Sequence, residues 1–209
     1  MTIFELVLVL IFSYLFGSIP WGFIIGKLKG VDIREHGSKN IGATNVTRVL
    51  GKPFGYLCFA LDFSKGFLPS YLMMFVISLP SAAKDGGVIL AILGIFLGHI
   101  FPVYLKFKGG KGVATGAGAI LAVSPLAAVM GFIVWVIIFK TTRYVSAASI
   151  IAAIIVPLLT IIFSATGTYQ LSIHLQTFVA VIGAIAILKH KSNIARLING
   201  TEYRFEKKN

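Results

Sequence analysis

A glycine-rich basic stretch, KFKGGKGVATG at residues 106–116, carries the clearest chemical signal in the chain. Three glycines surround Lys111, namely Gly109, Gly110 and Gly112. Glycines let successive backbone N–H groups turn toward an anion, and a lysine adds positive charge. The stretch is not a Walker A loop, because Gly112 stands where that motif requires Ser or Thr. We predict a phosphate-binding loop before a helix that begins near Val113; the alternative is a flexible basic loop touching anionic lipid.

A second polar segment, GSKNIGATNVTRVLG at residues 37–51, combines hydroxyl and amide side chains with one arginine. Its polar members are Ser38, Asn40, Thr44, Asn45, Thr47 and Arg48. Hydroxyls and amides can bond the OH groups of a polyol, and arginine can bind phosphate with two N–H groups. We predict a site for a phosphorylated polyol here; the alternative is a solvated loop followed by a helix N-cap, which favours the same residue types.

The third polar segment is KHKSNIARL, residues 189–197. If the preceding apolar helix continues through it, His190 and Asn193 are three residues apart and share a face that can present two hydrogen-bonding groups. The alternative for His190 is an ordinary interfacial side chain. The four histidines, at 36, 99, 174 and 190, show no metal-ligand spacing, so we expect neither a metal nor a cofactor.

The elements that must position these segments are membrane helices. The chain is 57% hydrophobic and 12% charged, against roughly 25% charged residues in soluble domains. Five apolar stretches approach the length of a bilayer span, and a sixth is longer than one span needs. They are residues 3–25, 54–79, 88–105, 144–163 and 173–188, with 113–139 as the sixth. We predict one all-α, polytopic membrane domain over residues 1–209, with no cleaved signal, because basic residues follow the first segment.

Charge predicts which face carries the chemistry. The net charge is +12, and basic residues gather at 27–52, 106–111, 140–143 and 189–208, whereas 80–87 and 164–172 are poor in them. The positive-inside rule places the basic groups in the cytoplasm. Residues 113–139 must then enter the membrane and return, and Ser124-Pro125 is the natural break. We predict about seven helical segments, including a short hairpin pair at 113–139; the alternative is one long tilted helix with Arg143 outside.

One pair of opposite charges falls within an apolar stretch. Asp62 and Lys65 are three residues apart in LDFSKG. A charge at the middle of a bilayer costs about 2.5–3.5 kcal/mol on insertion scales, so pairing is expected. We predict a structural ion pair that ties this helix to its neighbours.

The polar segments together resemble a known family. GSKNIGATNVTR, LDFSKGFLP, GHIFP with KFKGGKGVATG, RYVSAASI and the terminal H-x-x-N-I-x-R-L match, in order from about residue 17 to 205, the bacterial acyl-phosphate:glycerol-3-phosphate acyltransferases, the PlsY family. The resemblance implies transfer of a long-chain acyl group from acyl phosphate to the 1-hydroxyl of glycerol 3-phosphate. It implies that acyl-CoA and acyl carrier protein are not donors, and that no metal is needed.

The resemblance also implies residue roles. Ser38, Arg48, Lys111 and Asn193 hold glycerol 3-phosphate, and His190 orients Asn193 or the substrates. Thr44, Asn45 and the glycines Gly109, Gly110 and Gly112 contact the donor phosphate, and Asn40 joins them as a substrate-binding residue. The implied setting is the cytoplasmic face of a bacterial inner membrane. The implied partners are the two substrates, the lipid bilayer and the enzyme that produces acyl phosphate, with no nucleic acid.

A different class, a transporter for a phosphorylated solute, also needs basic and polar groups. Transporters usually place their sites near the membrane midplane, between internal repeats, with access from both faces. No such repeat is visible here, and the distinctive residues lie in segments of one predicted sidedness. A membrane scaffold would leave the glycine loop unexplained. The enzyme is therefore the preferred prediction.

Overall fold

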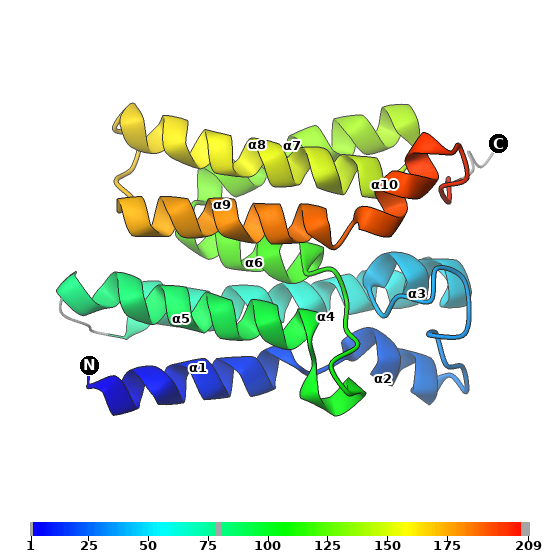
Figure 1. The fold of residues 1–209 in the computed structure, drawn as a ribbon, viewed down its shortest axis with the longest axis horizontal. Coiled ribbons are helices and arrows are strands. Elements are labelled where there is room, and N and C mark those ends of the chain that lie inside the picture. The colour runs from blue at the N-terminus through cyan, green and yellow to red at the C-terminus, as the bar shows by residue number, and fades with distance from the viewer. Residues whose placement is uncertain (1, 78–80, 206–209) are drawn as a thin grey trace. The chain divides into compact units, whose positions relative to one another are not determined.

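All regular elements in the described part of the chain are helical (Figure 1). The structure is a computed structural model that describes residues 2–77 and 81–205. It divides into two compact units, Met1–Val123 and Ser124–Asn209. The predicted all-α fold class is confirmed, and the assignment of both units to a single functional domain stays a prediction.

The first unit contains six α-helices: α1 (Ile3–Gly17), α2 (Trp21–Leu28), α3 (Ala43–Leu50), α4 (Lys52–Tyr71), α5 (Ser81–Ile100) and α6 (Val113–Val123). A π-helix, Leu72–Val76, continues α4, and a 3-10 turn, Val103–Leu105, follows α5. Helix α1 packs along α5, and α4 packs along α6 (Figure 1). Residues 81–87, expected in an outer loop, are the first turns of α5, and Pro80 lies outside the described residues.

Glycines let these helix pairs approach closely. Gly94 and Gly98 on α5 lie against the backbone of α1, where a side chain at Gly98 would overlap the carbonyl of Tyr14. In the same way, Gly66 on α4 and Gly118 on α6 each lie against the backbone of the other helix. Small residues at such contacts are typical of helix pairs in lipid, where close packing of the backbones takes the place of the hydrophobic effect.

A proline divides the first apolar stretch. The sequence predicted one span over residues 3–25, but α1 ends at Gly17 and α2 begins at Trp21, directly after Pro20. Proline has no N–H to donate and disfavours helical angles at the residue before it, which favours the break at this point. Ser18 Oγ donates to the carbonyl of Tyr14 at 2.7 Å and satisfies part of the interrupted turn.

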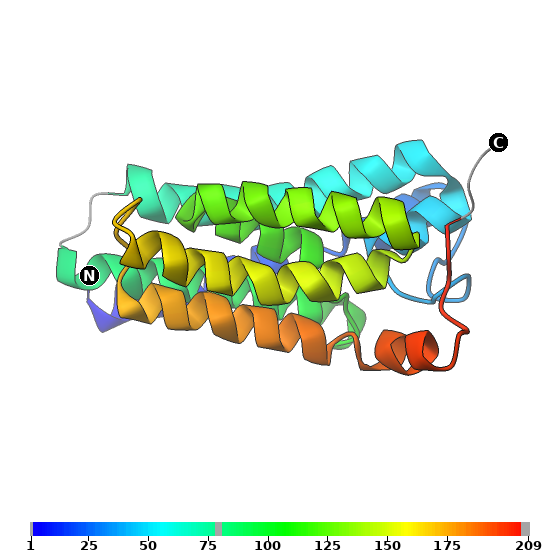
Figure 2. The same cartoon turned by 90° about the horizontal axis from the view of Figure 1, so that it is seen from above.

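The second unit contains α7 (Pro125–Thr142), α8 (Val145–Ala165), α9 (Ile173–Leu188) and α10 (Lys191–Ile198). Helix α8, yellow in Figure 2, lies between α7 and α9. Polar side chains join these helices: Trp135 Nε1 donates to Ser149 Oγ at 3.1 Å, and the Ser124 hydroxyl is bonded to Tyr169 and lies 3.2 Å from that of Thr160. Such bonds satisfy polar groups where lipid offers none.

Four helical segments in the described chain are long and apolar enough to cross a membrane, namely Ile3–Leu28, Lys84–Leu105, Pro125–Thr142 and Val145–Ala165. The bent pair Ile173–Leu188 and Lys191–Ile198, with 54° between its arms, is a fifth if it is one span. Helix α4, the core of the predicted span 54–79, is not among them, and residues 78 and 79 lie outside the described chain. The predicted count of seven segments is not confirmed.

The predicted break at Ser124-Pro125 is confirmed, because α6 ends at Val123 and α7 begins at Pro125. Helix α6 is short, with 11 residues, as expected of a hairpin arm. Helix α7 has 18 residues and continues to Thr142, so it is longer than the predicted arm and qualifies as a span by itself. The two helices belong to different units, and the hairpin stays a prediction.

Candidate active site

Asn45, on α3, holds the loop that precedes this helix in the first unit. Its side chain is buried, with 1% of the residue exposed. Nδ2 donates to the carbonyls of Ile33 and His36 at 2.9 and 3.1 Å, and Oδ1 accepts from the N–H of Ser38 at 2.8 Å. Three backbone groups of the loop are thereby fixed to one helix, and the backbone of Ser38 is placed beside α3.

The other predicted residues of this segment are half-buried. Asn40 Oδ1 accepts from the N–H of Gly42 at 2.9 Å and shapes the turn that enters α3. Thr44 lies in the first turn of α3, and Arg48 lies in its last turn. The structure therefore brings Ser38, Asn40, Thr44 and Arg48 onto one helix and its preceding loop, partly accessible to solvent or substrate.

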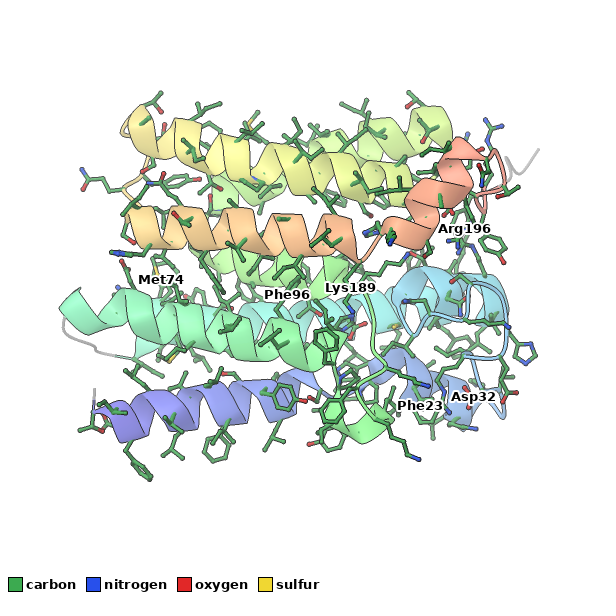
Figure 3. The ribbon with its side chains drawn as sticks, in the orientation of Figure 1. Phe23, Asp32, Met74, Phe96, Lys189 and Arg196 are labelled. Carbon is green, nitrogen blue, oxygen red and sulfur yellow. The ribbon has the colours of Figure 1, made fainter. Side chains whose placement is uncertain are left out.

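An acidic anchor stabilises the start of the same loop. Asp32 pairs with Arg34 at 2.7 Å and Lys27 at 3.2 Å, and the Arg34 guanidinium lies 4.4 Å from the Phe23 ring centre. Figure 3 shows Phe23 and Asp32 near each other at one end of this unit. Hydrogen bonding from Arg34 holds the pKa of Asp32 far below its usual range. Asp32 thus stays ionised and keeps the loop anchored at neutral pH.

The glycine loop leads from the end of α5 into α6. Lys106 and Phe107 adopt left-handed backbone angles, with φ of 51° and 63°. Gly112 has a φ of 81° and lies against the ring of Phe96 on α5. Lys108 is exposed, whereas Lys111 is half-buried. Helix α6 begins at Val113, as predicted. The arrangement presents Lys111 beside the positive end of a helix, which favours an anion.

The predicted ion pair in α4 is confirmed and has a third member. Lys65 Nζ lies 2.9 Å from Asp62 Oδ1 and donates to the carbonyl of Ile19 at 2.9 Å, which ties α4 to the end of α1. His99, on α5, places Nδ1 3.6 Å from the same carboxylate oxygen. The sequence reasoning did not connect His99 with this pair, although it lies in the GHIFP motif directly before the glycine loop.

In the second unit, Glu202 gathers three donors. Its Oε1 accepts from Asn193 Nδ2 at 2.7 Å and from Ser146 Oγ at 2.9 Å, and its Oε2 accepts from Arg196 Nε at 2.8 Å. Burial raises the pKa of Glu202, but these three hydrogen bonds outweigh it, and the pKa lies below its ordinary value. Sequence reasoning missed Glu202; its signal is an acidic residue inside a strongly basic C-terminal segment.

His190 lies at a bend, which corrects the expectation that the last helix continues through residues 189–197. Helix α9 ends at Leu188, α10 begins at Lys191, and the arms meet at 54°. The bend has a local cause, because His190 Nδ1 donates to the Ala186 carbonyl at 2.7 Å and caps the last turn of α9. His190 and Asn193 are both buried, and Glu202 holds the Asn193 amide; the role predicted for His190 stays a prediction.

Each unit thus assembles its own share of the predicted residues. Ser38, Arg48 and Lys111 belong to the first unit, and His190 and Asn193 belong to the second. Among the described residues, no group of three or more His, Cys, Asp and Glu side chains could hold a metal ion.

Comparisons with known proteins identify the family of this chain. Residues 7–200 match the family model described as glycerol-3-phosphate acyltransferase. The chain is 47% identical over 200 residues to a glycerol-3-phosphate acyltransferase of Aquifex aeolicus, covering 93% of this chain and 96% of that protein. It is 44% identical over 198 residues to one of Desulfotalea psychrophila, covering 94% and 96%.

The fold is also similar to solved structures of PlsY, an integral membrane glycerol 3-phosphate acyltransferase. Its glycerol 3-phosphate form has a TM-score of 0.84 at 45% identity, and its lysophosphatidic acid form has 0.82 at 44%. Both comparisons cover 97% of this chain and 96% of the other. The resemblance seen in the five sequence motifs is therefore confirmed: the chain belongs to the glycerol-3-phosphate acyltransferase family and is an integral membrane acyltransferase.

Proposed function

We propose that the acyl donor is a long-chain acyl phosphate and that the products are 1-acyl-glycerol 3-phosphate and inorganic phosphate. The 1-hydroxyl oxygen of glycerol 3-phosphate attacks the acyl carbon, and the bond from that carbon to the phosphate oxygen breaks. The leaving phosphate accepts the hydroxyl proton. An acyl phosphate is already activated, so no protein nucleophile is required.

The observation that carries this proposal is the glycine loop. Lys111 is half-buried between Gly110 and Gly112, and α6 begins directly afterwards. Backbone without side chains can lie close to a bound phosphate. A phosphate head with a hydrocarbon tail fits a phosphate loop on a membrane protein, because the tail can stay in the apolar region. The loop neutralises charge on the leaving phosphate.

The phosphate of glycerol 3-phosphate is assigned to Arg48, Ser38 and Lys111. Arg48 lies in the last turn of α3, and Asn45 fixes Ser38 against the same helix. A guanidinium can engage two phosphate oxygens at once, which an ammonium cannot. Binding both anionic substrates beside cations lowers their mutual repulsion and places the hydroxyl near the acyl carbon.

In the second unit, Asn193 is assigned to a substrate hydroxyl. Because Nδ2 donates to Glu202, the carbonyl oxygen Oδ1 is the atom suited to accept from a hydroxyl group. The hydrogen bonds that Glu202 accepts from Asn193, Ser146 and Arg196 hold that orientation. The net charge is +12, and the basic residues gather in the segments that carry these side chains. This supports an active site on the cytoplasmic face of a bacterial inner membrane. The enzyme that produces acyl phosphate could deliver its product there.

The test is a reaction of the purified protein with synthetic acyl phosphate and labelled glycerol 3-phosphate. We expect labelled 1-acyl-glycerol 3-phosphate and one inorganic phosphate for each acyl group transferred. Acyl-CoA and acyl carrier protein derivatives of the same chain length serve as matched donors and should give no product. Product from either of these, with none from acyl phosphate, would overturn the donor assignment while leaving the family membership intact.

A further inference from the structure

The imidazole of His99 lies against the glycine loop. The backbone carbonyl of His99 accepts from the N–H of Gly110 at 3.0 Å. A Cβ at Gly110 would overlap Nε2 of the same histidine and lie 2.9 Å from its Cε1. Gly110 has no left-handed φ, so an alanine there meets the ring rather than a backbone restriction. The ring therefore sets how closely the loop approaches α5.

Gly109, the preceding residue, meets a different obstacle. A Cβ there would overlap the backbone carbonyl of His99 and lie 2.6 Å from that of Ile100. Neither carbonyl can be removed by a side-chain substitution. A Cβ at Gly109 would also overlap Cδ of Pro102, but the two carbonyls remain whatever side chain stands there. The adjacent glycines thus provide a matched pair, in which one side-chain substitution can clear the space only at Gly110.

The imidazole lies beside a buried ion pair. Nδ1 lies 3.6 Å from Asp62 Oδ1, which pairs with Lys65 Nζ at 2.9 Å, and Lys65 in turn bonds the carbonyl of Ile19. The side chains of His99, Asp62 and Lys65 are 3%, 3% and 1% exposed. His99 Nδ1 has no hydrogen-bond partner among the described residues, so close packing and burial keep the ring in place against Gly110.

We propose that His99, buried beside the Asp62–Lys65 pair, is a positioning residue that fixes the Gly109–Lys111 backbone in the geometry that binds phosphate. The inference rests on the proposed phosphate-binding role of the loop. With the Gly110 N–H bonded to the His99 carbonyl and the Gly110 Cα resting on the ring, the direction of the neighbouring peptide groups is set. His99 acts through the loop and does not touch the reacting atoms.

The experiment combines Gly110→Ala with two replacements of His99. In His99→Asn, the short amide can place an atom where Nδ1 lies but cannot reach the position of Nε2. In His99→Gln, the longer amide reaches the position of Nε2 and keeps the obstacle. Each single and double variant is measured for KM and kcat with both substrates, and for the shift in Tm that inorganic phosphate produces in detergent.

We expect Gly110→Ala to lower kcat/KM by about tenfold or more and to abolish the phosphate-induced Tm shift, because the loop is displaced. His99→Asn should relieve the overlap, so that the double variant returns to within about threefold of His99→Asn alone, with its phosphate shift restored. His99→Gln should give no relief. Gly109→Ala should not be relieved by His99→Asn either. If the Asn variants do not fold, His99→Ala frees the same space and replaces them.

Two failures are distinguishable. Suppose that Gly110→Ala lowers kcat/KM and that the double variant shows the product of the two single-variant losses. The positioning role is then overturned, and the phosphate loop stands. If Gly110→Ala keeps wild-type kinetics and the full phosphate-induced Tm shift, the ring does not set the loop geometry and the positioning role is overturned. The phosphate loop itself falls only if Lys111→Ala also keeps the full phosphate-induced Tm shift.

Discussion

Asn193 Nδ2 donates to Glu202 Oε1 at 2.7 Å, so the carboxylate of Glu202 fixes the orientation of the amide and turns its acceptor, Oδ1, away from itself. A neutral amide at position 202 could itself supply N–H groups and permit the opposite orientation. The function assigned to Asn193 therefore depends on a residue nine positions later in the chain.

Glu202→Gln should lower kcat/KM by about tenfold or more, because hydrogen bonds to a charged group contribute about 1.5–3 kcal/mol each. Glu35→Gln is the control, since Glu35 is exposed and has no assigned role. Steady-state kinetics with both substrates check the expectation. Wild-type kinetics for Glu202→Gln would remove Glu202 from any part in orienting Asn193.

The same variant has a pH signature. The pKa of Glu202 is depressed in the folded protein, so its contribution to stability is present above the ordinary glutamate pKa of about 4.3 and is lost as pH falls through the folded value. Tm measured from neutral to acidic pH should therefore fall less steeply in Glu202→Gln than in the wild type. Parallel curves would contradict the hydrogen-bonded, ionised state of this carboxylate.

Asn45→Ala should destabilise the protein by about 1–3 kcal/mol, because it removes the bonds to two buried or half-buried carbonyls and one N–H. Thermal unfolding in detergent is the measurement. Asn40→Ala is the control, because Asn40 Oδ1 accepts one bond, from Gly42, within its own turn and should matter less. An unchanged Tm with a raised KM for acyl phosphate would instead support the direct substrate contact predicted from the sequence.

Lys111→Ala should lose about tenfold or more of kcat/KM while remaining folded, because Lys111 is half-buried beside the glycine loop and supplies charge-assisted bonds. Lys108 is exposed and directly follows the left-handed residues Lys106 and Phe107, so Lys108→Ala should change activity less than about threefold. The opposite ranking of the two variants would mean that the loop presents its other lysine to the substrates.

Arg48→Lys should raise the KM for glycerol 3-phosphate more than that for acyl phosphate. The charge is kept, but a lysine cannot form the paired bonds of a guanidinium. The measurement is a two-substrate titration of the wild type and the variant in the same detergent. A defect confined to acyl phosphate would show that the two phosphate sites have been exchanged.

Single cysteines at Lys52, Lys108, Thr141 and Ser192 should react with impermeant maleimide only from the cytoplasmic side. All four positions are exposed, and the native Cys58 is buried, so it should contribute little background. Labelling at 141 from outside would replace the predicted hairpin at 113–139 with a single crossing. Labelling at positions 52, 108 and 192 would still report the side of the membrane on which each of them lies.

Local features of the fold could be predicted from the sequence, because their causes lie within a few residues. The break at Ser124-Pro125 follows from proline chemistry, and the Asp62–Lys65 pair follows from helical spacing. The bend at His190 could not be predicted, since no proline or glycine marks it and its cause is a side-chain cap.

Long-range features of the candidate site needed the structure. Glu202 bonds Ser146 across 56 positions, and nothing in either local sequence points to the other. His99 had been noted only as a histidine without metal spacing, because its relation to Gly110 and Asp62 depends on how α4 and α5 pack. Asn45 was predicted to bind substrate, which stays a prediction, and the structure adds that its side chain bonds three backbone groups of the preceding loop.

The bond from Lys65 to the carbonyl of Ile19 bears on how the chain is inserted into the bilayer. Helix α4 is not among the segments that qualify as spans by themselves, and it carries two buried charges. The Lys65 ammonium on α4 donates to the carbonyl of Ile19, at the break between α1 and α2. That break lies earlier in the chain and is synthesised before α4. The interruption between α1 and α2 thus supplies a polar partner for a charge on α4 that lipid cannot supply.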